Sequence, residues 1–136
     1  MYNSCMYMSI EDDLKIRGDI ALQKKTIVHL MYSGDFVLNQ INTVLKPFDM
    51  TSQQFNVLRI LRGQQNSMVS LATIQERMIN KKSNTTRLID KLIKKDYVKR
   101  EINKNNRRKV NISISKKGLT LLESKNKLYL RQQKVF

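Results

Sequence analysis

The chain has little of what cross-links or interrupts a protein fold. Among 136 residues there is one cysteine, one histidine, one proline and four glycines. A lone Cys5 and a lone His29 cannot form an intrachain disulfide or a structural zinc site, each of which needs several such residues. A single cysteine is consistent with a reducing cytoplasm, where we expect the protein to act. With so few glycines and prolines to break them, helices should dominate the fold.

Long apolar runs and enzyme motifs are also missing. No stretch approaches the roughly 18 consecutive apolar residues of a transmembrane helix. No basic segment followed by an apolar run marks a secretory signal, and we expect residues 1–7 to be an extension before a natural start at Met8. The sequence has no P-loop, nucleophile elbow, zinc motif or glycine-rich dinucleotide turn. We therefore expect no enzyme, no cofactor, no metal and no membrane partner.

Positive charge is abundant and unevenly distributed. The formal net charge is +15, with 26 lysines and arginines against 11 acidic residues. Between Arg77 and Lys117 there are 15 basic and three acidic residues, which gives this segment a net charge of +12. Self-repulsion on that scale indicates an anionic partner. Nucleic acid is the first candidate; an anionic membrane surface ranks second on charge alone, and we do not expect it as a partner.

Apolar positions spaced by threes and fours predict a long first helix. We expect it to begin after Asp19, which would cap it, and to reach Lys46. Pro47 ends it, because a residue before proline is driven out of the helical region. Gly34 is predicted to interrupt it, at a cost of about 1 kcal/mol relative to alanine.

Two shorter helices should follow. Thr51 with Gln54 three residues later is a capping-box pattern, and Gly63 is placed to end the helix that it opens. Ser70 starts the next helix, whose buried face should extend to Ile79.

A short polar turn at residues 80–82 then leads to a fourth helix, which Ser83 or Asn84 can cap. Two helices joined by so short a turn are typical of a helix-turn-helix. The inward face of the fourth helix carries Leu88, Ile89, Leu92 and Ile93. Its outward face carries Thr85, Thr86, Arg87, Lys91, Lys94 and Lys95.

After the fourth helix, the spacing of apolar residues changes from every three or four positions to every second position. Residues 97–102 and 110–114 alternate between apolar and polar, on either side of the basic stretch Asn103 to Lys109. This pattern predicts a β-hairpin with a long basic tip. Lys117 and Gly118 should close the unit before a final helix from Leu119 to Gln133.

In a helix-turn-helix the second helix lies in the major groove and its first residues meet base edges. A basic hairpin that follows such a motif is best explained as a wing, and Arg107 or Arg108 could insert into a narrow minor groove. The predicted base contacts are Ser83, Asn84, Thr85, Thr86 and Arg87; the predicted phosphate contacts are Lys81, Lys82 and Lys91; the wing contacts are Arg107, Arg108 and Lys109.

Three stretches resemble the MarR-type winged-helix regulators. They are LKPFDMTSQQFNVLRIL at 45–61, SNTTRLIDKLIKKDYV at 83–98, and the segment from NRRKV to ISKKG at 106–118. The resemblance covers about residues 20 to 125. It implies a mainly α fold with a small antiparallel β wing, a winged helix-turn-helix between N- and C-terminal dimerisation helices. The implied division is a tail at 1–18, a dimerisation helix at 19–46, the DNA-binding domain at 47–118 and a second dimerisation helix at 119–136.

The resemblance also implies a homodimer on pseudo-palindromic duplex DNA, often as a repressor. By position, Arg108 is the residue that enters the minor groove. Asn106 stands where the family has an acid, and Asp96 replaces a glycine but still tolerates the left-handed conformation. Because further helix is expected after Phe136, the C-terminal dimerisation helix should be shortened.

Relatives often bind small aromatic effectors between the dimer helices and the DNA-binding part. His29, Tyr32 and Phe36 are the matching candidates for such a pocket, although filling the core is the simpler role for them. Two alternatives to sequence-specific regulation stay open. One is a non-specific or architectural nucleic-acid binder that uses the same basic surface, and the other is a truncated relative that cannot dimerise.

Overall fold

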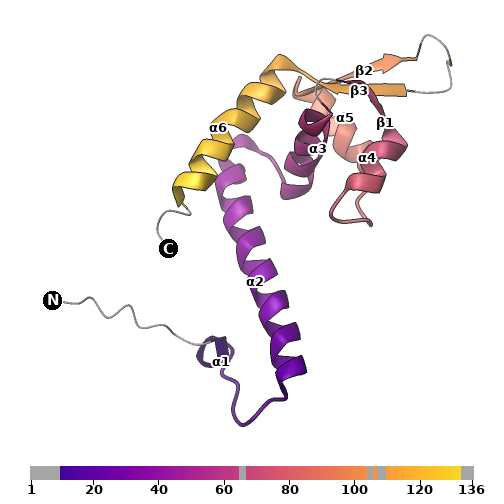
Figure 1. The fold of residues 1–136 in the computed structure, drawn as a ribbon. Coiled ribbons are helices and arrows are strands. Elements are labelled where there is room, and N and C mark those ends of the chain that lie inside the picture. Colours follow the sequence, from indigo (N-terminus) through magenta and orange to yellow (C-terminus); the bar gives the residue numbers. More distant parts are fainter. Residues whose placement is uncertain (1–9, 65–66, 104–105, 107–109, 133–136) are drawn as a thin grey trace. The chain divides into compact units, whose positions relative to one another are not determined.

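The computed structural model describes residues 10–64, 67–103, 106 and 110–132 (Figure 1). Along the chain the elements are α1 (Ile10–Asp13), α2 (Leu22–Leu45), the 3-10 helix η1 (Lys46–Phe48), α3 (Ser52–Gly63), β1 (Val69–Ser70), α4 (Leu71–Arg77), α5 (Thr85–Lys94), β2 (Val98–Ile102), β3 (Val110–Ile114) and α6 (Lys116–Gln132). Two compact units are formed, residues 1–39 and residues 40–136. None of the helices in the described ranges has the length and apolar character that crossing a membrane requires.

The first unit contains α1 and most of α2. Helix α2 begins at Leu22, so the expectation that Asp19 caps it is wrong. A capping side chain is worth only about 1 kcal/mol, which is too little to fix the start of a helix by itself. The helix also continues through Gly34 without a break, because glycine keeps its backbone N–H and costs only about 1 kcal/mol in a helix.

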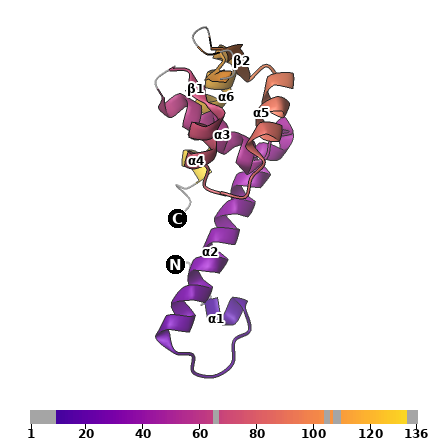
Figure 2. The same cartoon turned by 90° about the vertical axis from the view of Figure 1, so that its right-hand side faces the viewer.

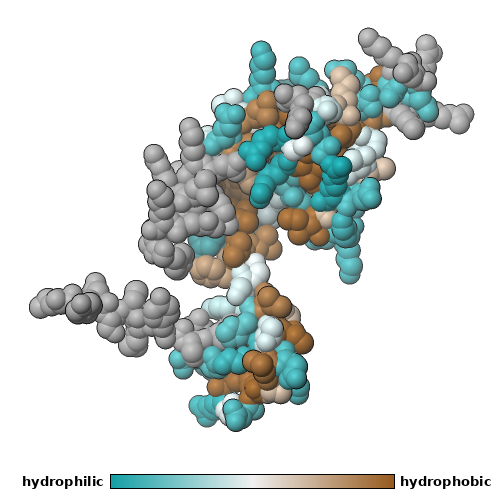
Figure 3. Space-filling model, in the orientation of Figure 1, coloured by the Kyte–Doolittle hydropathy of each residue, from teal (hydrophilic) through white to brown (hydrophobic). Residues whose placement is uncertain are grey.

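Much of the apolar surface of α2 is uncovered within this unit. Leu30 and Met31 are each 70% exposed, and Leu22 and Ile27 are also largely exposed. In the space-filling view, hydrophobic side chains gather over this part of α2 (Figure 3). Among the described residues of this unit, nothing covers these apolar side chains.

The second unit is built around α3, which packs against α4, α5, α6 and β3 (Figures 1 and 2). Every helix and each longer strand of this unit contributes to one apolar core. Its fully buried members are Leu45, Val57, Leu58, Leu61, Ile74, Met78, Ile89, Leu92, Ile112 and Leu122. Packing in this core orients α4, α5 and the sheet relative to α3.

The starts of α3 and α4 confirm the predicted caps. The hydroxyl of Thr51 accepts from the backbone N–H of Gln54 at 3.2 Å, and the Gln54 side chain accepts from the Thr51 N–H at 3.0 Å. Helix α3 ends at Gly63 as predicted. At α4 the Ser70 hydroxyl accepts from the N–H of Thr73 at 3.2 Å. These caps satisfy backbone donors that the first turn of a helix leaves free.

Helix α4 is shorter than its apolar pattern suggested. It ends at Arg77, and Met78 has an extended backbone that turns the chain away. Ile79 therefore lies outside the helix and is 83% exposed, so its predicted place on the buried face is wrong. In the sequence, the helical spacing of apolar residues continues to Ile79, although the helix in the structure ends at Arg77.

The sheet has three antiparallel strands in the order β1-β3-β2. The predicted hairpin is confirmed, with Val98 opposite Ile114 and Ile102 opposite Val110. Strand β1 was not predicted, because two residues are too few to show an alternating pattern. It adds Val69 to the far side of β3, opposite Ile112.

The final helix begins at Lys116, three residues before its predicted start. The hydroxyl of Ser115 accepts from the N–H of Gly118 at 3.0 Å, which is the geometry of an N-terminal cap. Gly118 lies inside the first turn of α6 and does not end the preceding unit. The position of Gly118 between two elements suggests a terminator. In the structure glycine is needed there for another reason, because the Tyr97 carbonyl lies close to its backbone.

Candidate nucleic-acid interface

The turn between α4 and α5 is closed by its own asparagine. The side-chain oxygen of Asn80 accepts from the N–H of Lys82 at 3.0 Å, and the Asn80 carbonyl accepts from the N–H of Ser83 at 3.1 Å. Asparagine favours such local bonds, which is why it suits tight turns. Two core helices with an ordered turn between them make the predicted helix-turn-helix.

Asn84 is the residue that caps α5. Its side-chain oxygen accepts from the N–H of Arg87 at 3.1 Å, and its backbone carbonyl accepts from the N–H of Leu88. The cap uses one of the two lone pairs of this oxygen, so a bidentate pair between Asn84 and adenine would have to share the oxygen with the cap or displace it. The hydroxyl oxygen of the alternative, Ser83, is buried and has no hydrogen-bond partner within the described residues.

Thr85 differs from its predicted place on the outward face of α5. The residue is 3% exposed, and its hydroxyl donates to the side-chain oxygen of Gln75 in α4. Its side chain therefore joins two helices of the domain and is not presented to a ligand. Gln75 was not among the predicted site residues, because a lone glutamine on a helix gives no pattern in the sequence.

The remaining predicted contacts of α5 are exposed. Arg87, Lys91 and Lys94 are spaced by four and three residues, so they form one basic stripe along the helix. Thr86 lies beside the start of the stripe and is also exposed. Nearby in the turn, Lys82 is exposed, whereas the ammonium of Lys81 folds back to donate to the Glu76 carbonyl.

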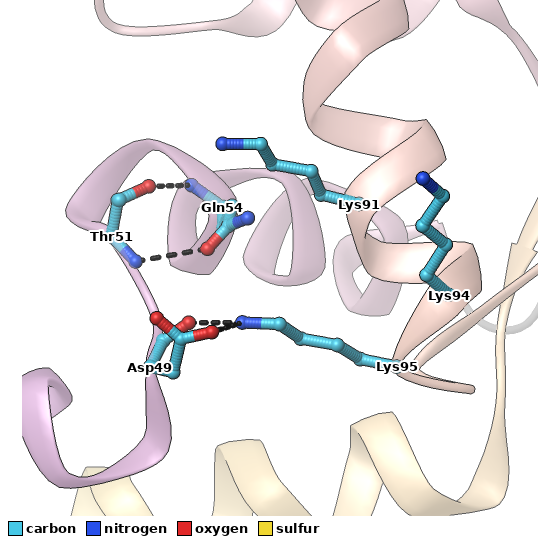
Figure 4. A pocket seen from close by; sticks show the side chains of 6 residues that line it. All are labelled: Asp49, Thr51, Gln54, Lys91, Lys94 and Lys95. Atoms are coloured by element: carbon cyan, nitrogen blue, oxygen red, sulfur yellow. Dashed lines mark hydrogen bonds and ion pairs between the residues drawn. The ribbon is translucent and has the colours of Figure 1, made fainter.

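A hollow of about 230 Å³ lies where the end of α5 meets the start of α3 (Figure 4). Its lining residues are Asp49, Thr51, Gln54, Lys91, Lys94 and Lys95. The ammonium of Lys95 lies 2.7 Å from the Asp49 carboxylate. The hydrogen bond from Lys95, then its charge, and more weakly Lys91, lower the pKa of Asp49 below its ordinary value of 3.8. Positive charges stabilise the C-terminus of a helix, so Lys94 and Lys95 have a structural role at the end of α5 that requires no bound ligand.

The wing is fastened to the helix-turn-helix near its base. Arg100 of β2 lies 3.3 Å from the Asp90 carboxylate on α5. Asp96, which joins α5 to β2, has a left-handed backbone with φ of 60°, as the predicted replacement for a glycine requires. Toward the tip, the N–H of Asn106 donates to the side chain of Asn103 at 3.1 Å. The predicted wing contacts Arg107, Arg108 and Lys109 lie outside the described residues.

The candidate effector residues all belong to the first unit. His29, Tyr32 and Phe36 follow one another along α2 at helical spacing, so they lie on one side of it. His29 is half-buried, and its Nε2 atom is buried with no hydrogen-bond partner in the part of the chain that the structure covers. The described ranges contain no group of three or more histidine, cysteine, aspartate or glutamate side chains that could hold a metal ion.

A capped helix that presents a basic stripe after an ordered turn, followed by a β-hairpin, defines a winged helix-turn-helix DNA-binding domain. Residues 50–110 match the model of the MarR family. The resemblance found in the sequence is thereby confirmed, and the fold is that of MarR-family transcription regulators. No curated protein sequence matches the chain.

Solved structures agree with this assignment of the fold. A MarR transcription factor from Planctomyces limnophilus is 28% identical, with a TM-score of 0.70 over 85% of this chain and 82% of that chain. A mutant of S. aureus MepR bound to an oligodeoxyribonucleotide is 18% identical, with a TM-score of 0.66 over 80% of each chain. Wild-type MarR from E. coli in its apo form is 24% identical, with a TM-score of 0.63 over 82% of this chain and 78% of that chain.

Proposed function

We propose that this protein is a cytoplasmic, sequence-specific regulator of transcription that binds a pseudo-palindromic duplex operator as a homodimer, most simply as a repressor. Helix α5 lies in the major groove and the basic wing lies in the minor groove. The main observation behind the proposal is the exposed basic stripe of α5, which follows the ordered turn between α4 and α5. The MepR structure with a bound oligodeoxyribonucleotide supports this choice of partner, because it has the same fold.

The proposed DNA contacts fall into two groups: contacts to bases and contacts to phosphates. Arg87 and Thr86 are exposed in the first turn of α5, where arginine can pair with guanine and threonine can meet a thymine methyl group. Lys82 and Lys91 are exposed and flexible, and they suit phosphates, which position the protein without reading sequence. In the wing we propose that Arg108 enters the minor groove, with Arg107 and Lys109 on the adjoining phosphates.

A second copy of the chain is the proposed cover for α2. The exposed apolar residues of this helix, among them Leu30, Met31 and Phe36, exceed the scattered apolar residues that a monomer usually shows. Twofold pairing through residues 19–46 and 119–136 would bury them and set two α5 helices at half-site spacing. Within this dimer, His29, Tyr32 and Phe36 are the proposed side chains for a small aromatic effector.

Selection of duplexes from a random pool by the purified full-length chain tests the proposed function. We expect one pseudo-palindromic sequence to be enriched, and to bind at physiological salt about 1,000-fold or more tightly than a scrambled duplex of the same length. Sedimentation of the free chain should give a dimer. A non-specific or architectural binder would show the same steep salt dependence but no enriched sequence. If scrambled DNA competes as well as the selected duplex, regulation by sequence is wrong.

A further inference from the structure

Gln75 makes two connections with one side chain. Its amide nitrogen donates to the carbonyl of Lys81 at 2.9 Å, and its amide oxygen accepts from the hydroxyl of Thr85. Gln75 belongs to α4, Lys81 to the turn and Thr85 to the first position of α5. All three parts of the helix-turn-helix therefore meet at one carboxamide.

The orientation of this carboxamide is fixed. A flipped amide would turn its oxygen toward the Lys81 carbonyl, and two acceptors cannot form a hydrogen bond. Thr85 is buried, so its hydroxyl has no water to replace Gln75. Both ends of the amide are thus committed, and the side chain has one arrangement that satisfies all three polar groups.

Among the described residues, the other polar contacts of the turn do not join α4 to α5. Asn80 bonds to Lys82 and Ser83 within the turn, and Asn84 bonds to Arg87 within α5. The remaining link back to α4 is the flexible ammonium of Lys81, which donates to the Glu76 carbonyl. Within the part of the chain that the structure describes, Gln75 is therefore the polar side chain that ties the first turn of α5 to the helix before it.

We propose that Gln75 is a positioning residue that sets the sequence preference of the protein without touching DNA. The inference rests on the proposed function. The exposed reading residues Thr86 and Arg87 directly follow Thr85, so a change in its position displaces them. Hydrogen bonds to base edges tolerate little displacement, whereas long lysine side chains follow a phosphate easily. Loss of the Gln75 connections should therefore reduce discrimination between sequences more than it reduces affinity for DNA in general.

The test compares Gln75→Leu, Thr85→Val and the double variant with the unaltered chain. Affinities are measured for the selected duplex and for its scrambled counterpart, over a range of salt, together with the thermal unfolding midpoint. Gln53→Leu, a half-exposed glutamine of α3 outside the helix-turn-helix, is the matched control. Thr85→Val keeps the shape of the side chain and removes only the hydroxyl, so the test does not depend on Gln75→Leu folding well.

For Gln75→Leu we expect the preference for the selected duplex to fall about tenfold, which corresponds to one lost base contact. The affinity for scrambled DNA should stay within about twofold and the salt slope should not change, because the phosphate contacts remain. Thr85→Val should show part of the same loss. The double variant should lose no more than Gln75→Leu alone, because both substitutions remove one shared bond.

Equal losses on the two duplexes, or an unchanged preference with a lower unfolding midpoint, would show that Gln75 has only a structural role. An unaltered chain without any preference would refute the proposed function itself, and the positioning role with it. An unaltered chain with a preference that Gln75→Leu and Thr85→Val retain would refute the positioning role alone.

Discussion

Lys95, directly after α5, donates from its ammonium to both the backbone carbonyl and the carboxylate of Asp49, a residue 46 positions earlier in the chain. Asp49 has a left-handed backbone and lies two residues before Thr51, the N-cap of α3. On the other side, the ammonium of Lys117 donates to the Lys95 carbonyl at 2.9 Å and lies 5.0 Å from the centre of the Tyr97 ring. These lysines link the start of α3, the end of α5 and the start of α6 at one point.

The Asp49–Lys95 pair predicts part of the acid sensitivity of the fold. The pKa of Asp49 is lower in the folded state than its ordinary value of 3.8, so the pair stabilises the fold fully above that pH. Its contribution is lost as the pH falls through the lower, folded value. We expect Asp49→Asn to lower the unfolding midpoint at neutral pH and to flatten the decline below about pH 4. Unfolding followed by circular dichroism across this range measures both effects.

Glu123→Gln is the control for this experiment, because Glu123 is exposed on α6 and also carries a carboxylate. Since the Asp49 side chain is itself exposed to solvent, the effect should shrink as salt is raised. Parallel pH profiles for the unaltered chain and Asp49→Asn would mean that the pair contributes nothing measurable.

Gly118 predicts a sharp steric penalty. A Cβ atom at this position would lie 2.5 Å from the Tyr97 carbonyl oxygen and 2.8 Å from Cγ1 of Ile114. Backbone is one of the two obstacles, so the clash cannot be relieved by a rotamer change alone. We expect Gly118→Ala to reduce the free energy of unfolding by about 1–3 kcal/mol in urea denaturation. Gly63→Ala, with open space around the added methyl group, should be neutral or stabilising, and equal losses from both would contradict this account.

Asp96 predicts a stabilising substitution. Its backbone has φ of 60°, while its N–H donates to the Ile93 carbonyl and its own carbonyl accepts from the Ser115 hydroxyl at 2.7 Å. These bonds hold the left-handed conformation, which glycine adopts without a steric cost. Asp96→Gly should therefore raise the free energy of unfolding by up to about 1 kcal/mol, and Asp96→Ala should lower it by about 1 kcal/mol. The reverse order in urea denaturation would show that the aspartate side chain itself stabilises this corner.

Features encoded by neighbouring residues could be predicted from the sequence. The capping box of Thr51 and Gln54 lies within one helical turn, and the β2–β3 hairpin shows its alternation over residues 98–102 and 110–114. Local hydrogen bonds and a period of two are visible without knowing the packing. The helix-turn-helix and its wing followed from these elements and their order.

Features set by distant contacts could not be predicted. Thr85 turns inward because of Gln75, ten residues earlier on another helix, and no period in α5 reveals that. Gly118 is required by the Tyr97 carbonyl, a contact between the residue before β2 and the first turn of α6. The basic stripe of the site was predictable from its residue types, whereas the side chains that hold it in place were not.

Replacing Arg87 and replacing Lys91 should have different effects on DNA binding. Both are exposed on the stripe of α5, but Arg87 lies in the first turn, where side chains reach base edges. We expect Arg87→Ala to cost about 1–3 kcal/mol on the selected duplex and much less on scrambled DNA. Lys91→Gln should weaken binding similarly on every duplex and reduce the slope of log affinity against log salt by about 1.

Fluorescence anisotropy titrations at several salt concentrations separate the two effects. Lys24→Gln, an exposed lysine of α2 outside the helix-turn-helix, is the control for loss of one positive charge and should change neither preference nor slope. If Arg87→Ala lowers affinity equally for both duplexes, then Arg87 contacts phosphate, and sequence reading must come from Thr86 and the wing. If Lys91→Gln leaves the salt slope unchanged, the stripe does not follow the DNA backbone past the first turn of α5, and the orientation proposed for the helix in the groove is wrong.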